Sequence, residues 1–365
     1  MPILEKIVIA NFRNIELQEI DFSPNVNCIS GNNGEGKTNL LDAIYYLSMT
    51  KSAFASSDRF CYRHGTDEFS IAGTYRMENS LASRFALKMT SKGEKKVRRD
   101  DKPYTKVSEH IGVLPIVMVS PSDISMVSES GEERRRFMNA VLSQMDREYM
   151  SALQQYNRLL LQRNKMLKEN HVDRSLLDIV DMRMAAYAEP VYKARKSFVE
   201  ELVPIVKEYY KAVSGDSEDV DIVYDTELSK AGLDQILSAS FEKDRVLRYT
   251  TSGPQRDDLL FTMNGHPIRR CGSQGQQKSF LVSLKFAQYE IMKRKSGFAP
   301  MLLLDDVFDK LDMGRISNLL QMVASKDFGQ IFITDSNKVR MAGIVDRLTQ
   351  DRAYFETAGG TFKRI

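Results

Sequence analysis

The segment GNNGEGKT, residues 31–38, constrains the fold of this chain more than any other stretch. It matches G-x-x-x-x-G-K-[ST], in which glycines let backbone N–H groups approach a phosphate closely. Residues 25–30 (NVNCIS) predict a short buried strand before it, and apolar residues at helical spacing follow it at Leu40, Leu41, Ile44 and Leu47. A strand, a loop and a helix in this order turn the positive end of the helix dipole toward the loop. This order argues against a glycine-rich turn that binds nothing.

The loop residues are therefore candidates for binding a nucleotide. Lys37 is expected to reach the β- and γ-phosphates and so to take part in catalysis, and the hydroxyl of Thr38 to coordinate Mg²⁺. The full set of candidate nucleotide-binding residues is Gly31, Asn32, Asn33, Gly34, Glu35, Gly36, Lys37 and Thr38.

A second candidate site lies in PMLLLDDVF, residues 300–308, which predicts a buried strand ending in two carboxylates. A Mg²⁺-nucleotide site needs one carboxylate at a strand end near the metal, and Asp305 fits this role. Asp306 beside it is a candidate for orienting or deprotonating the attacking water. An ordinary acidic turn after a strand is the alternative.

The segment CGSQGQQKSF, residues 271–280, predicts the start of a helix with Ser273 as N-cap and Gln276 completing a capping box. A helix start can also bind a phosphate, with Gly275 allowing close approach of the backbone. A nucleotide bound by a single chain does not need two glycine-rich helix starts. A nucleotide enclosed between two chains does, because each chain then contributes one of them. The candidate trans contacts are Ser273, Gln274, Gly275 and Gln276.

Composition limits the class of protein. The chain has 365 residues, enough for two domains, and its net charge of +3 permits a nucleic-acid partner without requiring one. It has no apolar run long enough for a membrane span. Its three cysteines are far apart, which favours free thiols and a cytoplasmic location.

The pattern of predicted strands and helices divides the chain into three parts. Residues 1–130 read mostly as strands and are expected to form the N-terminal part of a head. Residues 131–247 are expected to form a mostly helical arm, and residues 248–365 to complete the head. Strands are expected in 3–22, 68–77, 84–90, 95–100 and 114–120. Pro190 and Pro204 argue against a long continuous coiled coil in the arm.

Together these motifs resemble the ATPase heads of the ABC type, and within them the RecF family of DNA repair proteins. The resemblance is carried over nearly the whole chain by NFRN (11–14), GNNGEGKTN, SPSDISMV (120–127), RRRF (134–137), QRNKML (162–167), TSGPQRDDL (251–259), GSQGQQKS and LLLDDVFDKLD. It implies an α/β fold: a P-loop head with an antiparallel β lobe, plus a mostly helical arm insert.

The resemblance also implies a function. The chain would be a cytoplasmic, weak ATPase of recombinational repair that uses ATP and Mg²⁺. It would form a homodimer on ATP, bind gapped DNA and single-strand/duplex junctions, and work with RecR- and RecO-type proteins to load the recombinase. In this family pattern Ser273–Gln276 is the signature and Asp312 ends the D-loop.

The sequence departs from the family pattern at three places. Gln255 stands where the family usually has histidine, and Asp309 and Lys310 stand where it usually has Ser-Glu. Thr334 or Asp335 occupies the position of a histidine in many ABC ATPases, as is common in RecF-like heads. The first two departures leave open how the D-loop communicates between subunits.

Candidate DNA contacts are basic clusters at two places, since Lys and Arg grip phosphates. Such charge runs are often only solvated faces. The candidates are Lys95, Lys96, Arg98, Arg99, Arg134 and Arg135.

Three other functions remain open from the residues alone. Another head of the SMC/Rad50 type would share the motifs. A transporter-type ATPase subunit would need a membrane partner, and a P-loop kinase would need an acceptor site but no signature segment.

Overall fold

The structure, a computed structural model, describes residues 1–78, 81–129, 131–169, 171–215, 218–307, 328–338, 343, 345 and 350–365. The chain divides into two compact units. Unit 1 comprises Met1–Ile124, Ala212–Ser214 and Leu281–Ile365, and unit 2 comprises Ser125–Lys211 and Gly215–Phe280. Residues 248–280 thus group with the helical insert. The domain boundaries expected at 130/131 and 247/248 stay a prediction.

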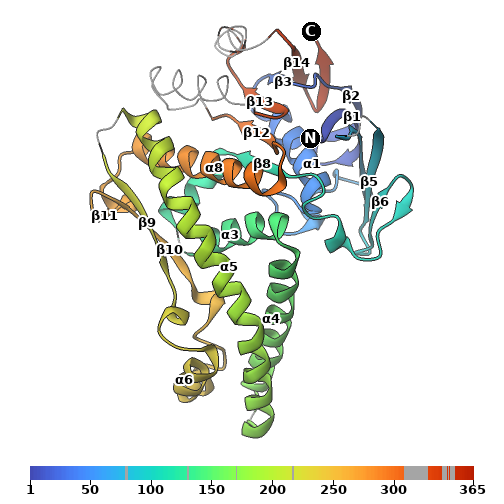
Figure 1. Ribbon diagram of the computed structural model, residues 1–365. Coiled ribbons are helices and arrows are strands. Elements are labelled where there is room, and N and C mark those ends of the chain that lie inside the picture. Colours follow the sequence, from blue (N-terminus) through green and yellow to red (C-terminus); the bar gives the residue numbers. More distant parts are fainter. Residues whose placement is uncertain are drawn as a thin grey trace. The chain divides into compact units, whose positions relative to one another are not determined.

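Unit 1 is built around a six-stranded, largely parallel sheet. Its strand order is β15-β14-β3-β13-β12-β8, so segments from both halves of the chain pair directly (Figure 1). Only β15 runs antiparallel to its neighbour. The strands are β3 (Val26–Ser30), β8 (Ile116–Val119), β12 (Met301–Asp305), β13 (Ile331–Asp335), β14 (Arg352–Ala358) and β15 (Thr361–Arg364). The strands β3, β8, β12 and β13 are buried along their whole length. The buried strands predicted in residues 25–30, 114–120 and 300–308 are confirmed.

A second, antiparallel sheet completes unit 1, with order β2-β1-β4-β5-β6-β7. Its strands are β1 (Ile3–Phe12), β2 (Ile15–Asp21), β4 (Glu68–Arg76), β5 (Ala82–Thr90), β6 (Lys95–Arg99) and β7 (Lys102–Pro103). Helix α1 (Lys37–Met49) contacts strands of both sheets, which explains why ten of its thirteen residues are buried. The α/β fold class predicted from the sequence is confirmed.

Unit 2 combines long helices with a small antiparallel sheet of order β11-β10-β9. Its helices are α2 (Ser125–Ser128), α3 (Gly131–Met145), α4 (Arg147–Met166), most of α5 (Arg174–Ser214), α6 (Leu233–Leu247), α7 (Ile268–Cys271) and the start of α8 (Gln274–Ser296). Its strands are β9 (Val220–Asp225), β10 (Asp258–Met263) and β11 (His266–Pro267). No helix within the described residues is long and apolar enough to cross a membrane.

Short 3-10 turns join these elements. They are Asp58–Phe60, Val107–Glu109, Pro121–Ile124, Glu227–Ser229 and Pro254–Arg256. Helices α4 and α5 begin at aspartate N-caps: Asp146 accepts from the Tyr149 N–H and Asp173 from the Leu176 N–H.

Helix α5 continues through both of its prolines. It runs for 41 residues with Pro190 and Pro204 inside it. Each proline removes one N–H donor and leaves the carbonyl four residues earlier without its helical partner. Pro190 and Pro204 are both exposed, and so are Ala186 and Glu200, whose carbonyls lose that partner. Water can hydrate these carbonyls, so the helix continues.

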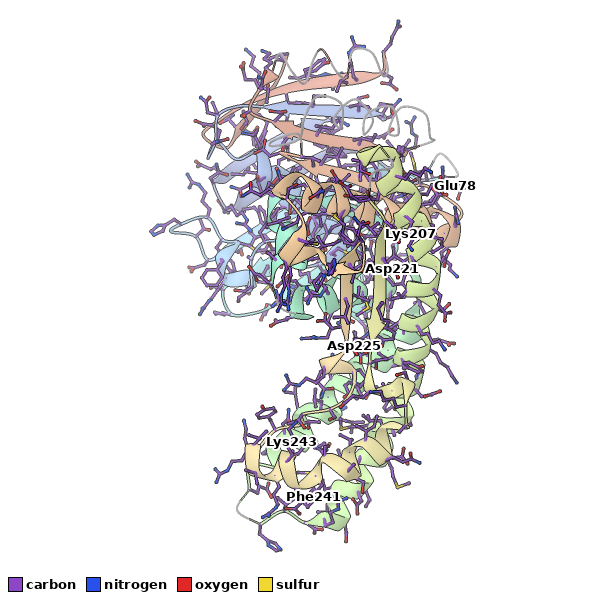
Figure 2. The ribbon with its side chains drawn as sticks, turned by 90° about the vertical axis from the view of Figure 1, so that its left-hand side faces the viewer. Glu78, Lys207, Asp221, Asp225, Phe241 and Lys243 are labelled. Atoms are coloured by element: carbon purple, nitrogen blue, oxygen red, sulfur yellow. The ribbon has the colours of Figure 1, made fainter. Side chains whose placement is uncertain are left out.

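Side chains from several elements hold unit 2 together. On the surface, Lys207 of α5 pairs with Asp221 of β9 at 3.4 Å (Figure 2). The guanidinium of Arg174 lies 4.0 Å above the ring centroid of Phe241 on α6. In the interior, the fully buried Arg163 of α4 donates to Asp181 at 2.7 Å and to Asp244 at 2.6 Å.

This interior cluster generates a stability prediction. Replacing Arg163 by Met leaves two buried carboxylates without their cation, which costs about 3–5 kcal/mol of unfolding free energy. Urea unfolding followed by circular dichroism measures the loss. The matched control is Arg245→Met, because Arg245 forms an exposed pair with Glu242 and should cost under about 0.5 kcal/mol. Equal losses in the two variants would contradict the prediction.

Candidate nucleotide site

The phosphate loop lies between β3 and α1, as the sequence predicts. Gly34 and Gly36 adopt φ values of 84° and 111°, in the region that favours glycine. A Cβ on Gly36 would lie only 2.8 Å from the side-chain amide nitrogen of Asn14. Lys37 is buried, and its ammonium donates to the carbonyls of Gly31 at 2.7 Å and Asn32 at 3.0 Å. The ammonium has three donors, so one remains for a phosphate oxygen.

Both ends of the chain support this loop through the carbonyl of Glu35. That oxygen accepts from the Asn14 amide at 3.3 Å, the Thr357 hydroxyl at 3.1 Å and the Gly360 N–H at 2.8 Å. The Glu35 carboxylate also accepts from the Gly359 N–H. The β14–β15 turn and the β1–β2 turn therefore fix the loop from outside it.

Thr38 and the end of β12 meet directly. The Thr38 hydroxyl lies 3.0 and 2.9 Å from the two carboxylate oxygens of Asp305, and Asp305 also accepts from the Thr334 hydroxyl at 2.7 Å. The Thr334 hydroxyl in turn accepts from the Asp306 N–H at 3.1 Å. Asp306 is half-buried and adopts a φ of 45°. The sequence placed Thr38 and Asp305 in one metal site, and the structure brings them into contact.

Burial dominates the electrostatics of Asp305. Loss of hydration raises its pKa above the ordinary value, and the neighbouring Asp306 carboxylate acts in the same direction. Hydrogen bonds from Thr334 and Thr38 and the charge of Lys37 oppose this rise, since they favour the ionised form. A divalent cation beside Asp305 would strengthen the ionised form further.

The donor atoms fit Mg²⁺ and a nucleotide triphosphate. A hydroxyl and a carboxylate are hard oxygen ligands, which Mg²⁺ prefers, and Mg²⁺ usually takes its remaining ligands from phosphates and water. A glycine-rich backbone, a helix start and a lysine such as Lys37 are groups of the kind that bind polyphosphate.

The signature segment opens α8 in unit 2. The predicted capping box is confirmed: the Ser273 N–H donates to the Gln276 side-chain oxygen at 2.7 Å, and the Gln276 N–H donates to the Ser273 hydroxyl at 3.3 Å. Ser273 and Gln274 are exposed. The expected D-loop residue Asp312, with Asp309 and Lys310, lies outside the described residues.

Two of the candidate DNA contacts are engaged within the protein. Arg134 is buried, forms a two-bond pair with Asp258 at 2.6 and 2.9 Å, and donates to two carbonyls. Lys95 pairs with Asp58 at 2.8 Å and donates to the Thr50 carbonyl. The expected role of Arg134 as a DNA contact is therefore corrected to a structural one, because Arg134 is buried and its donors are engaged within the protein. For Lys95, whose side chain is 22% exposed, a DNA contact stays a prediction.

The other candidates differ in their exposure. Arg135 is half-buried and donates to the Asp257 carbonyl at 2.8 Å. The exposed ones are Lys96, Arg98 and Arg99, all on β6.

Sequence reasoning missed the residues that support the loop, Asn14 and the β14–β15 turn. The segment NFRN has no phosphate-binding pattern of its own and belongs only to the motifs that carry the family resemblance. In the structure its Arg13 binds the buried Asp42 of α1 at 2.6 Å, while its Asn14 supports the phosphate loop. Gly359–Gly360 was the available signal for the second support, since both glycines adopt positive φ.

The fold and this site define an ATPase head of the ABC type. Residues 3–352 match the family model of the RecF/RecN/SMC N-terminal domain. The chain is 43% identical to the DNA replication and repair protein RecF of Parabacteroides distasonis over 358 residues, which is 98% of both chains. It is 40% identical to RecF of Bacteroides fragilis strain ATCC 25285 over 100% of this chain and 98% of that one. The chain belongs to the RecF family.

Solved structures agree with this assignment. A structure of the recombination mediator protein RecF-ATP in the RecFOR pathway superposes with a TM-score of 0.90 at 29% identity, covering 100% of this chain and 98% of that one. An SMC head from Pyrococcus furiosus superposes with a TM-score of 0.59 at 17% identity, which shows a shared fold only.

The hydrogen bonds that support the phosphate loop generate one prediction. Asn14→Ala removes a hydrogen bond to the Glu35 carbonyl and one from Asn39, so ATP affinity should fall about three- to tenfold, the equivalent of one hydrogen bond. Calorimetric titration with ATP measures this. Glu19→Ala is the control, because Glu19 lies on β2 in an exposed pair with Lys6. Wild-type affinity in Asn14→Ala would mean that the loop holds its own shape.

The carboxylates of Asp305 and Asp306 generate a second prediction for this site. Asp305→Asn should weaken Mg²⁺-dependent ATP binding, since it removes the charge beside Thr38. Asp306→Asn should leave binding intact and slow hydrolysis by about a hundredfold or more, the usual contribution of a general base. Binding titrations with and without Mg²⁺, and phosphate release, separate the two. Unchanged hydrolysis in Asp306→Asn would show that another group orients the water.

Proposed function

We propose that this protein is a DNA-repair ATPase that closes into a homodimer on ATP and, in that state, binds gapped DNA or single-strand/duplex junctions. The observation that carries the proposal is the combination of a formed phosphate site, with Thr38 against Asp305, and an exposed, capped helix start at Ser273. The first binds a nucleotide within one chain. The second is a phosphate-binding element that a partner chain's nucleotide would use.

The residues have separate tasks in this proposal. The loop N–H groups and Lys37 would bind the β- and γ-phosphates, and Thr38 and Asp305 would hold Mg²⁺, which would supply positive charge to offset that of the phosphates. Asp306 accepts the proton of the attacking water. Ser273 to Gln276 contact the γ-phosphate bound to the other chain. Slow hydrolysis then resets the dimer, which makes the enzyme a weak ATPase and a switch.

ATP would stabilise the dimer because it binds both chains at once, and a ligand specific to the dimer favours it by mass action. Closing two chains also brings two sets of basic residues onto one DNA molecule, including Lys96, Arg98 and Arg99. Weak phosphate contacts then add up, and binding should depend steeply on salt. Its work on chromosomal DNA would place the protein in the cytoplasm.

The relatives support the repair assignment over the other functions. Their names include DNA replication and repair, and one solved relative is a mediator in the RecFOR pathway. We infer RecR- and RecO-type proteins as partners and loading of the recombinase as the outcome. A transporter subunit would hydrolyse ATP without responding to DNA, and a kinase would not depend on Ser273.

Substituting the signature serine tests this function. Ser273→Arg places bulk and charge on the exposed helix start, so it should abolish ATP-dependent dimerisation and ATP-dependent DNA binding while leaving ATP binding to the single chain unchanged. Light scattering, anisotropy with gapped DNA at fixed salt, and calorimetry measure the three. Lys37→Ala is the comparison, since it should lose ATP binding itself. A Ser273→Arg protein that dimerises and binds gapped DNA like wild type would refute the proposal.

A further inference from the structure

The start of helix α8, where the signature segment lies, is hydrogen-bonded to the side chain of a residue outside all of the sequence motifs. The carboxylate of Glu218, which precedes β9, accepts from the Gln276 side-chain amide at 2.7 Å. Its other oxygen accepts from the hydroxyl of Tyr210, on α5, at 2.8 Å. A chain of hydrogen bonds thus runs from Tyr210 through Glu218 and Gln276 to Ser273.

The direction of these hydrogen bonds is fixed by chemistry. An ionised carboxylate only accepts, so the Gln276 amide must turn its NH₂ toward Glu218. Its oxygen then faces the Ser273 N–H and completes the capping box. Without Glu218 the side-chain amide of Gln276 can rotate by half a turn. Its NH₂ group would then face the Ser273 N–H, so two donors would meet with no acceptor between them.

This arrangement also leaves the Ser273 hydroxyl in the state that phosphate binding needs. Its oxygen accepts from the Gln276 N–H, so its hydrogen remains available to donate outward. A phosphate oxygen offers only acceptors, and a hydroxyl hydrogen directed at it is the required complement.

Tyr210 is fixed by packing onto the same helix that the signature opens. It is buried, and its ring lies 6.5 Å from that of Phe280, which in turn packs at 4.9 Å against Phe261 of β10. The carboxylate is therefore anchored by the hydrophobic core of unit 2 and is not a freely rotating surface group.

We infer that Glu218 is a positioning residue for the signature segment: through Gln276 it orients Ser273 for the γ-phosphate bound to a second chain. The inference rests on the proposed ATP-dependent dimer. It adds a residue outside the signature, between α5 and β9, on which closing of the dimer depends.

Glu218→Ala tests the inference. It should raise the protein concentration needed for ATP-dependent dimerisation about tenfold, the equivalent of one hydrogen bond to a charged group, while calorimetry shows unchanged ATP binding to the monomer. Glu218→Gln keeps an acceptor for the Gln276 amide and should dimerise within about twofold of wild type. Asp219→Asn is the matched control for charge, because Asp219 is adjacent and its side chain is 77% exposed.

Two further variants separate an effect on protein stability from an effect on dimerisation. Glu218→Ala leaves the buried Tyr210 hydroxyl without this acceptor, so Tyr210→Phe and the double variant Tyr210→Phe/Glu218→Ala are measured beside it. The dimerisation defect should persist in the double variant even where its thermal midpoint matches Tyr210→Phe.

Two results would overturn the inference. Wild-type dimerisation in Glu218→Ala would show that the signature orients itself. Tighter dimerisation in Glu218→Gln than in wild type would show that the carboxylate opposes the nucleotide by charge. Ser273→Arg, measured in parallel, distinguishes these two results from a failure of the proposed dimer. If Ser273→Arg also dimerises normally, the dimer proposal itself fails, and not only the role of Glu218.

Discussion

The site in unit 1 depends on the hydrogen bond between Thr38 and Asp305. These residues are separated by 267 positions, and the contact joins the first turn of α1 to the end of β12. It forms because β3 and β12 are parallel strands of one sheet, each adjacent to β13, so their carboxyl ends reach the same edge. Thr334 at the end of β13 completes the group by donating to Asp305. A buried carboxylate is stable there because hydroxyl donors offset part of its lost hydration.

The phosphate loop illustrates how much a short motif leaves to distant residues. The glycines permit the backbone conformation, but they do not select it, since glycine adopts many conformations readily. The selection comes from Asn14, Thr357 and Gly360, whose donors converge on the carbonyl of Glu35. Segments near both chain ends therefore support the candidate nucleotide site, although neither contains a phosphate-binding motif.

Unit 2 uses buried charge in a comparable way. Arg163, Asp181 and Asp244 come from α4, α5 and α6, and Arg195 joins α5 to Asp257 at 2.6 Å. Buried pairs of this kind contribute little net stability, but they penalise any packing that separates them. The arm helices can therefore remain in one arrangement without the long apolar seam of a coiled coil. At the start of α8, Glu218 and Tyr210 extend this use of directed polar contacts to a short segment, since their hydrogen bonds reach Gln276 and through it Ser273.

The sequence by itself determined the strand–loop–helix around Gly31–Thr38, the strand ending in Asp305 and the capping box at Ser273, because each depends on residues close together in the chain. The α/β class followed from the resemblance that motifs along nearly the whole chain carry. The sequence misjudged the role of Arg134, because that outcome depends on which face of helix α3 is buried. Only the tertiary structure brought Asn14 and Gly360 to the phosphate loop and Glu218 to Gln276. Hydrogen bonds between distant residues leave no periodic or local pattern in a sequence, since their distances and directions are set only when the packed elements position both partners.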